Sequence, residues 1–237
     1  MTTIVWDGKT KTLAADSRTA VRSAARSILR DGTDKIITFS DEDNHEWSED
    51  EHILLIAGAG SVEQIEFLIT LVLTHGNKIV DAFKGLPNLH KVAASLSRAG
   101  VLMITTKFCY HIEIDFKRPE IIKVSKHSLG KQLSIGSGSK YANLAMKVFG
   151  FSAIHAARFA RLSDTGSGGP IISFTVLPTG KIRENAPVPD RGVEDDFNVF
   201  KATIAALPTR AVDMKPRNLY GQNTLIQKLV REKRNPK

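Results

Sequence analysis

The sequence alternates blocks of strand-like segments with pairs of helix-like segments, and this order most constrains the fold. The β-rich runs are 2–6, 10–15, 35–39, 53–57, 101–114, 121–124, 132–135, 171–177 and 181–183, and the helix patterns are 62–74, 89–98, 141–149 and 152–162. Blocks of this kind are typical of layered α+β proteins, whereas βαβ folds alternate single elements. We therefore predict an α+β fold: a four-layer αββα sandwich of two antiparallel sheets flanked by helices.

The apolar pattern weakens after residue 187, which predicts a domain of residues 2–187 followed by a basic C-terminal helical extension of residues 188–237. Two helix patterns, 193–206 and 224–231, lie in this extension. From Arg210 onward, eight Lys or Arg residues stand against two acidic ones, so this tail holds +6 of the formal net charge of +8. A basic tail can bind nucleic acid, an acidic partner or a neighbouring subunit, or it can be a solvated end. No nucleic-acid motif accompanies it, so we do not expect nucleic-acid binding.

Several classes of protein are excluded by what the sequence lacks. The longest apolar run, residues 65–73, is too short to span a membrane and contains Glu66. The first residues do not form the charged and apolar regions of a secretory signal. Cys109 is the only cysteine, and the seven histidines have no metal-ligand spacing. We therefore expect a cytoplasmic protein with no membrane association, metal or cofactor.

Residues 17–30 carry four arginines spaced four residues apart, at positions 18, 22, 26 and 30. On a helix they would form one basic stripe. The same segment could instead be an irregular loop. We predict a helix here, with a solvated basic face.

Thr2 is the first residue of chemical interest. A threonine hydroxyl is a poor nucleophile unless a base removes its proton. The α-amine of the same residue can be that base, because its ordinary pKa lies near neutrality. This requires that Met1 be removed, since a peptide bond would abolish the basicity of the nitrogen. Many chains begin with Met-Thr, so the argument needs further residues.

Five further features supply them: 2–5 (Thr-Thr-Ile-Val) with 13–18 (Leu-Ala-Ala-Asp-Ser-Arg), 34–36 (Asp-Lys-Ile), Gly58, 136–139 (Gly-Ser-Gly-Ser) and 164–169 (Asp-Thr-Gly-Ser-Gly-Gly). Their order and approximate spacing resemble those of proteasome β-subunits and their bacterial relatives, which are N-terminal-nucleophile (Ntn) hydrolases. The resemblance covers about residues 2–185. Residues 18–30 do not resemble the substrate-pocket hairpin of the family, so side-chain specificity cannot be transferred.

The resemblance implies a role for each matching residue. Asp16 is the buried carboxylate beside the threonine, and it would hold Lys35, whose cation lowers the cost of forming an alkoxide. The backbone N–H of Gly58 would form the oxyanion hole, where glycine permits close approach of a substrate carbonyl. Ser137, Asp164 and Ser167 would hydrogen-bond around the amine of Thr2; these three lie in the most specific of the matching motifs.

The implied function is that of a threonine peptidase, which hydrolyses polypeptide substrates through an acyl-enzyme on Thr2. The family further implies a ring of identical subunits, and such rings usually work with an ATP-dependent unfoldase. An alternative is a catalytically inactive structural or assembly protein on the same scaffold, which binds partners through its basic tail. Retention of Met1 would favour this alternative.

Overall fold

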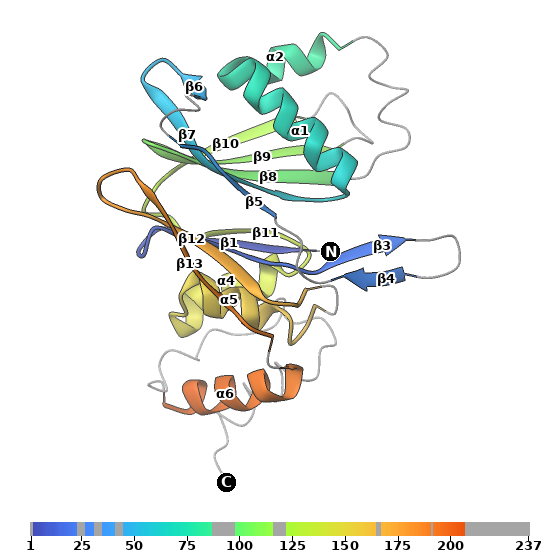
Figure 1. The fold of residues 1–237 in the computed structure, drawn as a ribbon, viewed down its shortest axis with the longest axis vertical. Helices are drawn as coiled ribbons and strands as arrows, with labels where there is room; N and C mark the ends of the chain where they lie inside the picture. Colours follow the sequence, from blue (N-terminus) through green and yellow to red (C-terminus); the bar gives the residue numbers. More distant parts are fainter. Residues whose placement is uncertain are drawn as a thin grey trace.

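Two antiparallel sheets lie face to face in the computed structural model (Figure 1). The structure describes residues 2–22, 27–30, 35–40, 45–86, 98–115, 122–164, 167–190 and 192–206. The first sheet contains, in spatial order, β11 (Leu133–Gly136), β1 (Thr3–Asp7), β2 (Thr12–Asp16), β12 (Ile171–Val176) and β13 (Ile182–Val188). The second contains β10 (Ile122–Ser128), β9 (Phe108–Asp115), β8 (Arg98–Thr105), β7 (Glu51–Ala59) and β5 (Ile36–Thr38), and β6 (Glu46–Ser48) pairs with β7.

Helices cover the outer face of each sheet. The second sheet is covered by α1 (Val62–His75) and α2 (Ile79–Lys84), which are joined by the short 3₁₀ helix η1 (Gly76–Lys78). The first sheet is covered by α4 (Ser139–Phe149) and α5 (Ala153–Ala160). The predicted four-layer αββα sandwich of antiparallel sheets is thereby confirmed.

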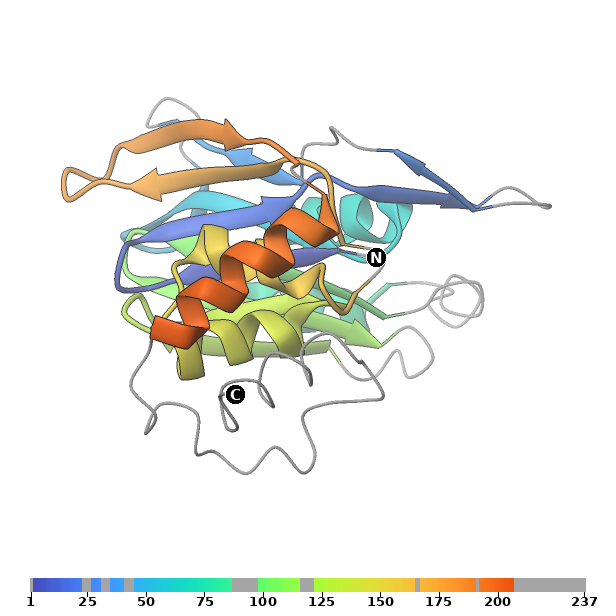
Figure 2. The same ribbon diagram turned by 90° about the horizontal axis from the view of Figure 1, so that it is seen from below.

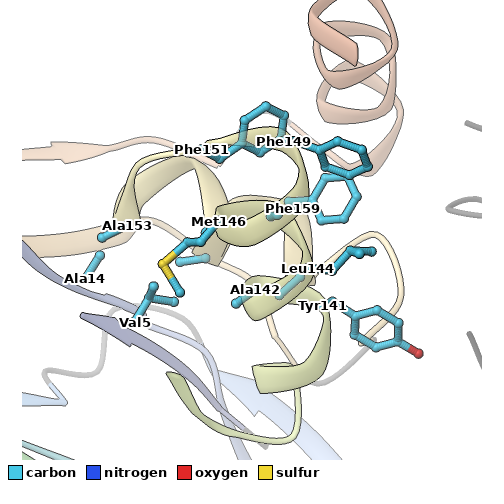
Figure 3. Close-up of a cluster of buried hydrophobic side chains, with 14 of the residues drawn as sticks. Val5, Ala14, Tyr141, Ala142, Leu144, Met146, Phe149, Phe151, Ala153 and Phe159 are labelled. Atoms are coloured by element: carbon cyan, nitrogen blue, oxygen red, sulfur yellow. The ribbon is translucent and has the colours of Figure 1, made fainter. Parts of the chain in front are cut away.

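Three buried apolar clusters fill the spaces between the four layers. Alternate residues of β1 point to opposite faces of their sheet, as the pleat requires. Ile4 and Trp6 join the cluster between the sheets, whereas Val5 joins the cluster under α4 and α5. That second cluster, seen in Figure 3, includes Met146 and Phe159. A strand buried on both faces cannot slip in register without exposing apolar side chains, so β1 is held firmly up to its first residue.

The turn between β1 and β2 has a specific polar structure. Asp7 accepts hydrogen bonds from the N–H of Lys9 at 3.1 Å, from Oγ1 of Thr10 at 3.0 Å and from Nε2 of Gln132 at 3.1 Å. A Cβ at Gly8 would lie 2.2 Å from the carbonyl carbon of Gly130, so only glycine fits this contact. The Asp7-Gly8 turn is therefore also a packing site.

The helix predicted over residues 17–30 is wrong. The chain forms an antiparallel hairpin there, with β3 at Thr19–Arg22 and β4 at Ser27–Arg30, and Thr19 lies opposite Arg30. Arginines four apart on a helix would repel one another, and β-branched residues favour extended backbone. The hairpin projects from the side of the sandwich at which β1 begins (Figures 1 and 2).

The beginning of the predicted extension packs against the domain. The expected boundary after residue 187 falls inside β13, and α6 (Val193–Ala206) then lies across the helical layer (Figure 2). Phe200 of α6 is buried, and its ring centroid lies 5.3 Å from that of Phe151 and 5.4 Å from that of Phe159. Burial of one phenylalanine side chain stabilises a contact of this kind by about 1.5–3 kcal/mol.

Charged residues fasten the same helix. Asp196 of α6 is buried and pairs through Oδ1 with Nη2 of Arg158, and its Oδ2 lies 3.4 Å from Nε of Arg161. Arg161 also pairs through Nη1 with Oδ1 of Asp190, in the segment between β13 and α6. We call Arg158, Arg161, Asp190 and Asp196 the arginine cluster.

Some predictions fall outside the described residues. These are the helix at 89–98, apart from Arg98, which opens β8, the helix at 224–231 and the basic tail from Arg210. In the part of the chain that is described, no helix has the length and apolarity needed to cross a membrane. Over the same ranges, no three His, Cys, Asp or Glu side chains gather as metal ligands. Cys109 is buried between the sheets, where burial raises the pKa of its thiol to about 12.

Candidate active site

The start of β1 meets three polar side chains that come from distant parts of the sequence. Thr2 is buried, and its backbone N–H donates to Oγ of Ser137 at 3.2 Å. Ser137 donates in turn to Oδ2 of Asp164 at 2.5 Å. Ser167 donates to the same Oδ2 at 2.7 Å. We call Thr2, Ser137, Asp164 and Ser167 the threonine cluster.

Each member of the threonine cluster is placed by the end of a regular element. Ser137 lies in the turn between β11 and α4, Asp164 follows α5, and Ser167 precedes β12. The N–H of Asp164 donates to the carbonyl of Ala160, which closes the last turn after α5 at 2.9 Å. The two Gly/Ser-rich motifs of the sequence, 136–139 and 164–169, therefore lie together at the start of β1, where Ser137 contacts Thr2 directly and Asp164 contacts Ser137.

The preceding residue, Gly136, must be glycine for this geometry. Gly136 lies opposite Thr3 in the β1–β11 pairing and has a φ of +90°. A Cβ at this position would lie 2.0 Å from the carbonyl oxygen of Thr2. The close approach of β11 to the start of β1 brings Ser137 within hydrogen-bonding distance of the Thr2 nitrogen.

A second group of charges lies beside the threonine cluster. Asp16 ends β2 and is almost fully buried, and its Oδ1 lies 2.9 Å from Nζ of Lys35. The same Oδ1 accepts the N–H of Thr3 at 2.8 Å, and Oδ2 accepts the N–H of Gly168 at 2.9 Å. Lys35 also donates to the carbonyl oxygen of Arg18. The predicted pairing of Asp16 with Lys35 is thus observed in the structure.

Burial dominates the electrostatics of Asp16. Desolvation raises the pKa of its carboxyl above the ordinary value, and the opposing effects come from Lys35 and the N–H groups of Thr3 and Gly168. A carboxylate held by a cation and two backbone donors has its position and orientation fixed. Asp16 therefore holds the ammonium of Lys35 in one place at the base of the site.

Thr3 connects the two groups of side chains. Its N–H binds Asp16, and its Oγ1 lies 2.5 Å from Oγ of Ser167. The sequence offered no role for Thr3 beyond its place in the opening motif. Thr3 lies two residues before Val5, whose side chain faces α4 and α5, so the side chain of Thr3 points to the same face of the sheet.

Comparisons with known proteins concern the fold of the chain. No family model and no curated protein matches the sequence. Two structures of Anbu from Hyphomicrobium sp. strain MC1, a proteasome-like protein, resemble the chain. The Gly-1 mutant has a TM-score of 0.57 at 14% identity and covers 91% of this chain and 98% of its own. The second has a TM-score of 0.53 at 11% identity and covers 88% and 98%. The chain has the proteasome-like Ntn-hydrolase fold.

A third structure is that of eukaryotic HslV from Trypanosoma brucei. It has a TM-score of 0.48 at 19% identity, and the match covers 77% of this chain and 99% of that one.

Within this fold, Gly58 lies inside β7, one residue before the end of the strand. The strand predicted to end at residue 57 continues to Ala59, so Gly58 pairs with Val101 inside β7 and β8. A Cβ at Gly58 would lie 2.2 Å from Cγ2 of Ile65, so glycine is needed here for α1 to pack. The side chain of Ala59 would lie 3.5 Å from a Cβ at Gly136, which places the end of β7 beside the threonine cluster. The oxyanion role of the Gly58 N–H stays a prediction.

Two residues near the site were not singled out from the sequence. Arg18 packs its guanidinium against Gly168, where a Cβ would lie 2.5 Å from Cζ of the arginine. Asp190 accepts the N–H of Gly169 at 3.2 Å. Arg18 is the last residue of the 13–18 motif, whereas Asp190 lies in a Pro-Asp-Arg-Gly sequence that indicates only a loop.

Proposed function

We propose that the chain is a threonine-type peptidase that hydrolyses polypeptides through an acyl-enzyme on Thr2 after removal of Met1. The observation that carries this proposal is the hydrogen bond from the nitrogen of residue 2 to Ser137, which is itself held by Asp164. A buried network around a backbone nitrogen is what an amine base requires, because it orients the nitrogen toward the hydroxyl of the same residue. The Asp16–Lys35 pair next to it supplies a fixed cation.

The reaction would proceed in two steps. The Thr2 amine takes the proton of Oγ as Oγ attacks the substrate carbonyl, and the N–H of Gly58 stabilises the oxyanion. The ammonium then gives its proton to the leaving amine, and the C–N bond breaks to leave an ester on Thr2. Water attacks this ester with the amine again as base, which releases the acid and restores Oγ–H. Lys35 lowers the free energy of the alkoxide throughout.

The same proposal includes the setting of the reaction. We place the chain in a homo-oligomer, a ring or another closed assembly of identical subunits, in the cytoplasm. An ATP-dependent unfoldase would deliver polypeptide substrates to it. The homo-oligomer and the unfoldase follow from the resemblance of the sequence motifs to the proteasome family.

Intact-mass analysis and an electrophilic probe test the proposal together. A peptide epoxyketone forms a ring with both the hydroxyl and the amine of an N-terminal threonine, whereas a β-lactone needs only the hydroxyl. We expect the native mass to lack methionine and both probes to add to residue 2. A chain that retains Met1 and reacts with neither probe would instead be a structural or assembly protein on the same fold, binding partners through its basic tail.

A further inference from the structure

Asp190 lies outside the motifs of the site, yet it contacts the chain on both sides of the threonine cluster's Asp164 and Ser167. Through Oδ1 it pairs with Arg161, three residues before Asp164. Through Oδ2 it accepts the N–H of Gly169, two residues after Ser167, at 3.2 Å. One carboxylate therefore joins the two described ends of the segment that carries both residues.

The backbone of this segment is held by two carboxylates in succession. The N–H of Gly168 donates to Asp16 at 2.9 Å, and the N–H of Gly169 donates to Asp190. Asp16 comes from β2 inside the sandwich, whereas Asp190 comes from the segment that leads into α6. Asp190 thus binds the backbone N–H of Gly169 from outside the sandwich, as Asp16 binds that of Gly168 from inside it.

Arg18 ties the two carboxylates into one arrangement. Its Nη2 lies 3.7 Å from Oδ2 of Asp190, and its N–H donates to the carbonyl of Gly168 at 3.1 Å. Its own carbonyl accepts a hydrogen bond from Lys35. A displacement of Asp190 would therefore also displace Gly168 and the carbonyl of Arg18 that accepts a hydrogen bond from Lys35.

Asp190 itself has a fixed position. The N–H of Gly192 donates to its Oδ1 at 2.9 Å, just before α6 begins. The helix is anchored independently by Asp196 with Arg158 and by buried Phe200. The extension thus supplies a rigid support from outside the two sheets.

We propose that Asp190 is a positioning residue that holds the segment carrying Asp164 and Ser167, so that the extension is a structural part of the catalytic site. This inference rests on the proposed function for its kinetic consequence. Its structural consequence, an ordered Gly168–Gly169 backbone, can be measured without any activity. No role in contacting substrate is assigned to Asp190.

Asp190→Asn is the decisive variant. The substitution replaces one carboxylate oxygen by an NH₂ group, which donates hydrogen bonds. The asparagine can therefore accept a hydrogen bond from the N–H of Gly169 or from Arg161, but not from both. Asp195→Asn is the matched control, since it makes the same change of charge at an exposed position of α6. The separate anchors of α6 should keep Asp190→Asn folded.

The first readout is hydrogen exchange followed by mass spectrometry, on peptides covering residues 167–176. We expect faster exchange in Asp190→Asn than in wild type, and no change in Asp195→Asn. Equal exchange in Asp190→Asn and wild type would overturn the proposal. This readout needs no turnover. If the wild-type protein proves unreactive, the proposed function is refuted, but the hydrogen-exchange result still decides whether Asp190 holds this segment.

The second readout is the reaction of Thr2 with the epoxyketone. Displacement of a catalytic group by about 1 Å can cost roughly 100-fold in rate, and we expect about a tenfold fall in the maximal acylation rate constant of Asp190→Asn. Half-saturation by the probe should not change, because Asp190 supports the proton-transfer groups. Asp190→Glu keeps both oxygens and should recover part of the rate. An unchanged rate constant in Asp190→Asn, or an equal fall in Asp195→Asn, would contradict the role.

Discussion

The threonine cluster and the arginine cluster are neighbouring polar networks, but they are built from different groups. The threonine cluster uses hydroxyls and one carboxylate, which hold a backbone nitrogen at 3.2 Å. The arginine cluster uses two guanidinium groups and two carboxylates, which form ion pairs between the end of α5 and the start of α6; among the described residues, Oδ2 of Asp196 has no hydrogen-bond partner. The first surrounds the nitrogen of Thr2, whereas the second joins the end of α5 to α6 and extends through Asp190 to the N–H of Gly169.

The difference in composition indicates that the two clusters have different roles. Paired charges such as Arg158 with Asp196 fix the relative position of two helices, and breaking them is costly because a buried charge is left without its partner. Hydroxyl networks cost less to bury and can exchange protons with a neighbouring amine. We therefore expect changes in the threonine cluster to affect rate and changes in the arginine cluster to affect stability.

The largest expected effect is that of Thr2→Ala. The variant should lose at least about 1,000-fold in reactivity with the epoxyketone, because the attacking oxygen is absent. Alanine still permits removal of Met1, so the loss cannot come from an unprocessed terminus. Thr2→Ser is the matched control and should remain reactive, while the urea midpoints of both variants should stay close to wild type. A Thr2→Ala protein that still labels would disprove the assignment of the nucleophile.

Asp196→Ala should have the largest effect on stability. Removal of one partner of a buried pair typically costs about 3–5 kcal/mol, and here it leaves Arg158 unpaired beneath α6. The free energy of unfolding from urea titration measures this loss. Asp195→Ala, at an exposed neighbouring position, should have little effect. If Asp196→Ala were as stable as this control, the arginine cluster would not be the anchor of α6.

Lys35→Met should change the rate more than the stability. Loss of an electrostatic stabiliser of this kind costs about 100-fold in rate, so labelling of Thr2 should slow by that order. The buried carboxyl of Asp16, whose pKa is already raised by desolvation, can take up a proton when its partner is removed, which limits the damage to the fold. Lys9→Met serves as the exposed control. Unimpaired labelling would leave Lys35 with a purely structural role.

The smallest expected effect is the pH dependence of Asp190→Asn. Burial alone would raise the pKa of Asp190, but the Gly192 N–H and Arg161 hold it below its ordinary value of 3.8. A carboxyl whose pKa is lower in the folded protein than in the unfolded chain stabilises the fold at pH values above the unfolded pKa. This stabilisation is lost as the pH falls through the folded pKa. Asp190→Asn should therefore lower the free energy of unfolding more at neutral pH than in acid, by a small amount because solvent screens this exposed group, as urea titrations at two pH values would show.

Asp16 should show the opposite sign. Because its pKa is raised in the folded protein, Asp16 stabilises the fold at pH values below its unfolded pKa of 3.8. This stabilisation is lost as the pH rises through the folded pKa. Equal pH dependence at the two aspartates would contradict this difference between Asp16 and Asp190.

Much of the site could be predicted because its motifs are local. Gly136 and Ser137 are residues typical of a short turn between a strand and a helix. The segment that begins at Asp164 likewise contains the glycines that its turn needs. The hairpin at 17–30 could not be predicted, because spaced arginines are compatible with both helix and strand until tertiary contacts decide. The strand boundary at Gly58 was placed too early, since glycine in a strand usually indicates a break, whereas here it admits Ile65 of α1.

The sequence alone determined the four layers and the types of groups at the start of β1, because apolar periodicity and short Gly/Ser segments act over a few residues. Only the tertiary structure decided that Asp190 reaches Gly169 and Arg161, and that Thr3 links Asp16 to Ser167. Contacts of this kind join residues that are far apart in the chain. They depend on how sheet and helices pack against one another, which no local pattern of residues specifies.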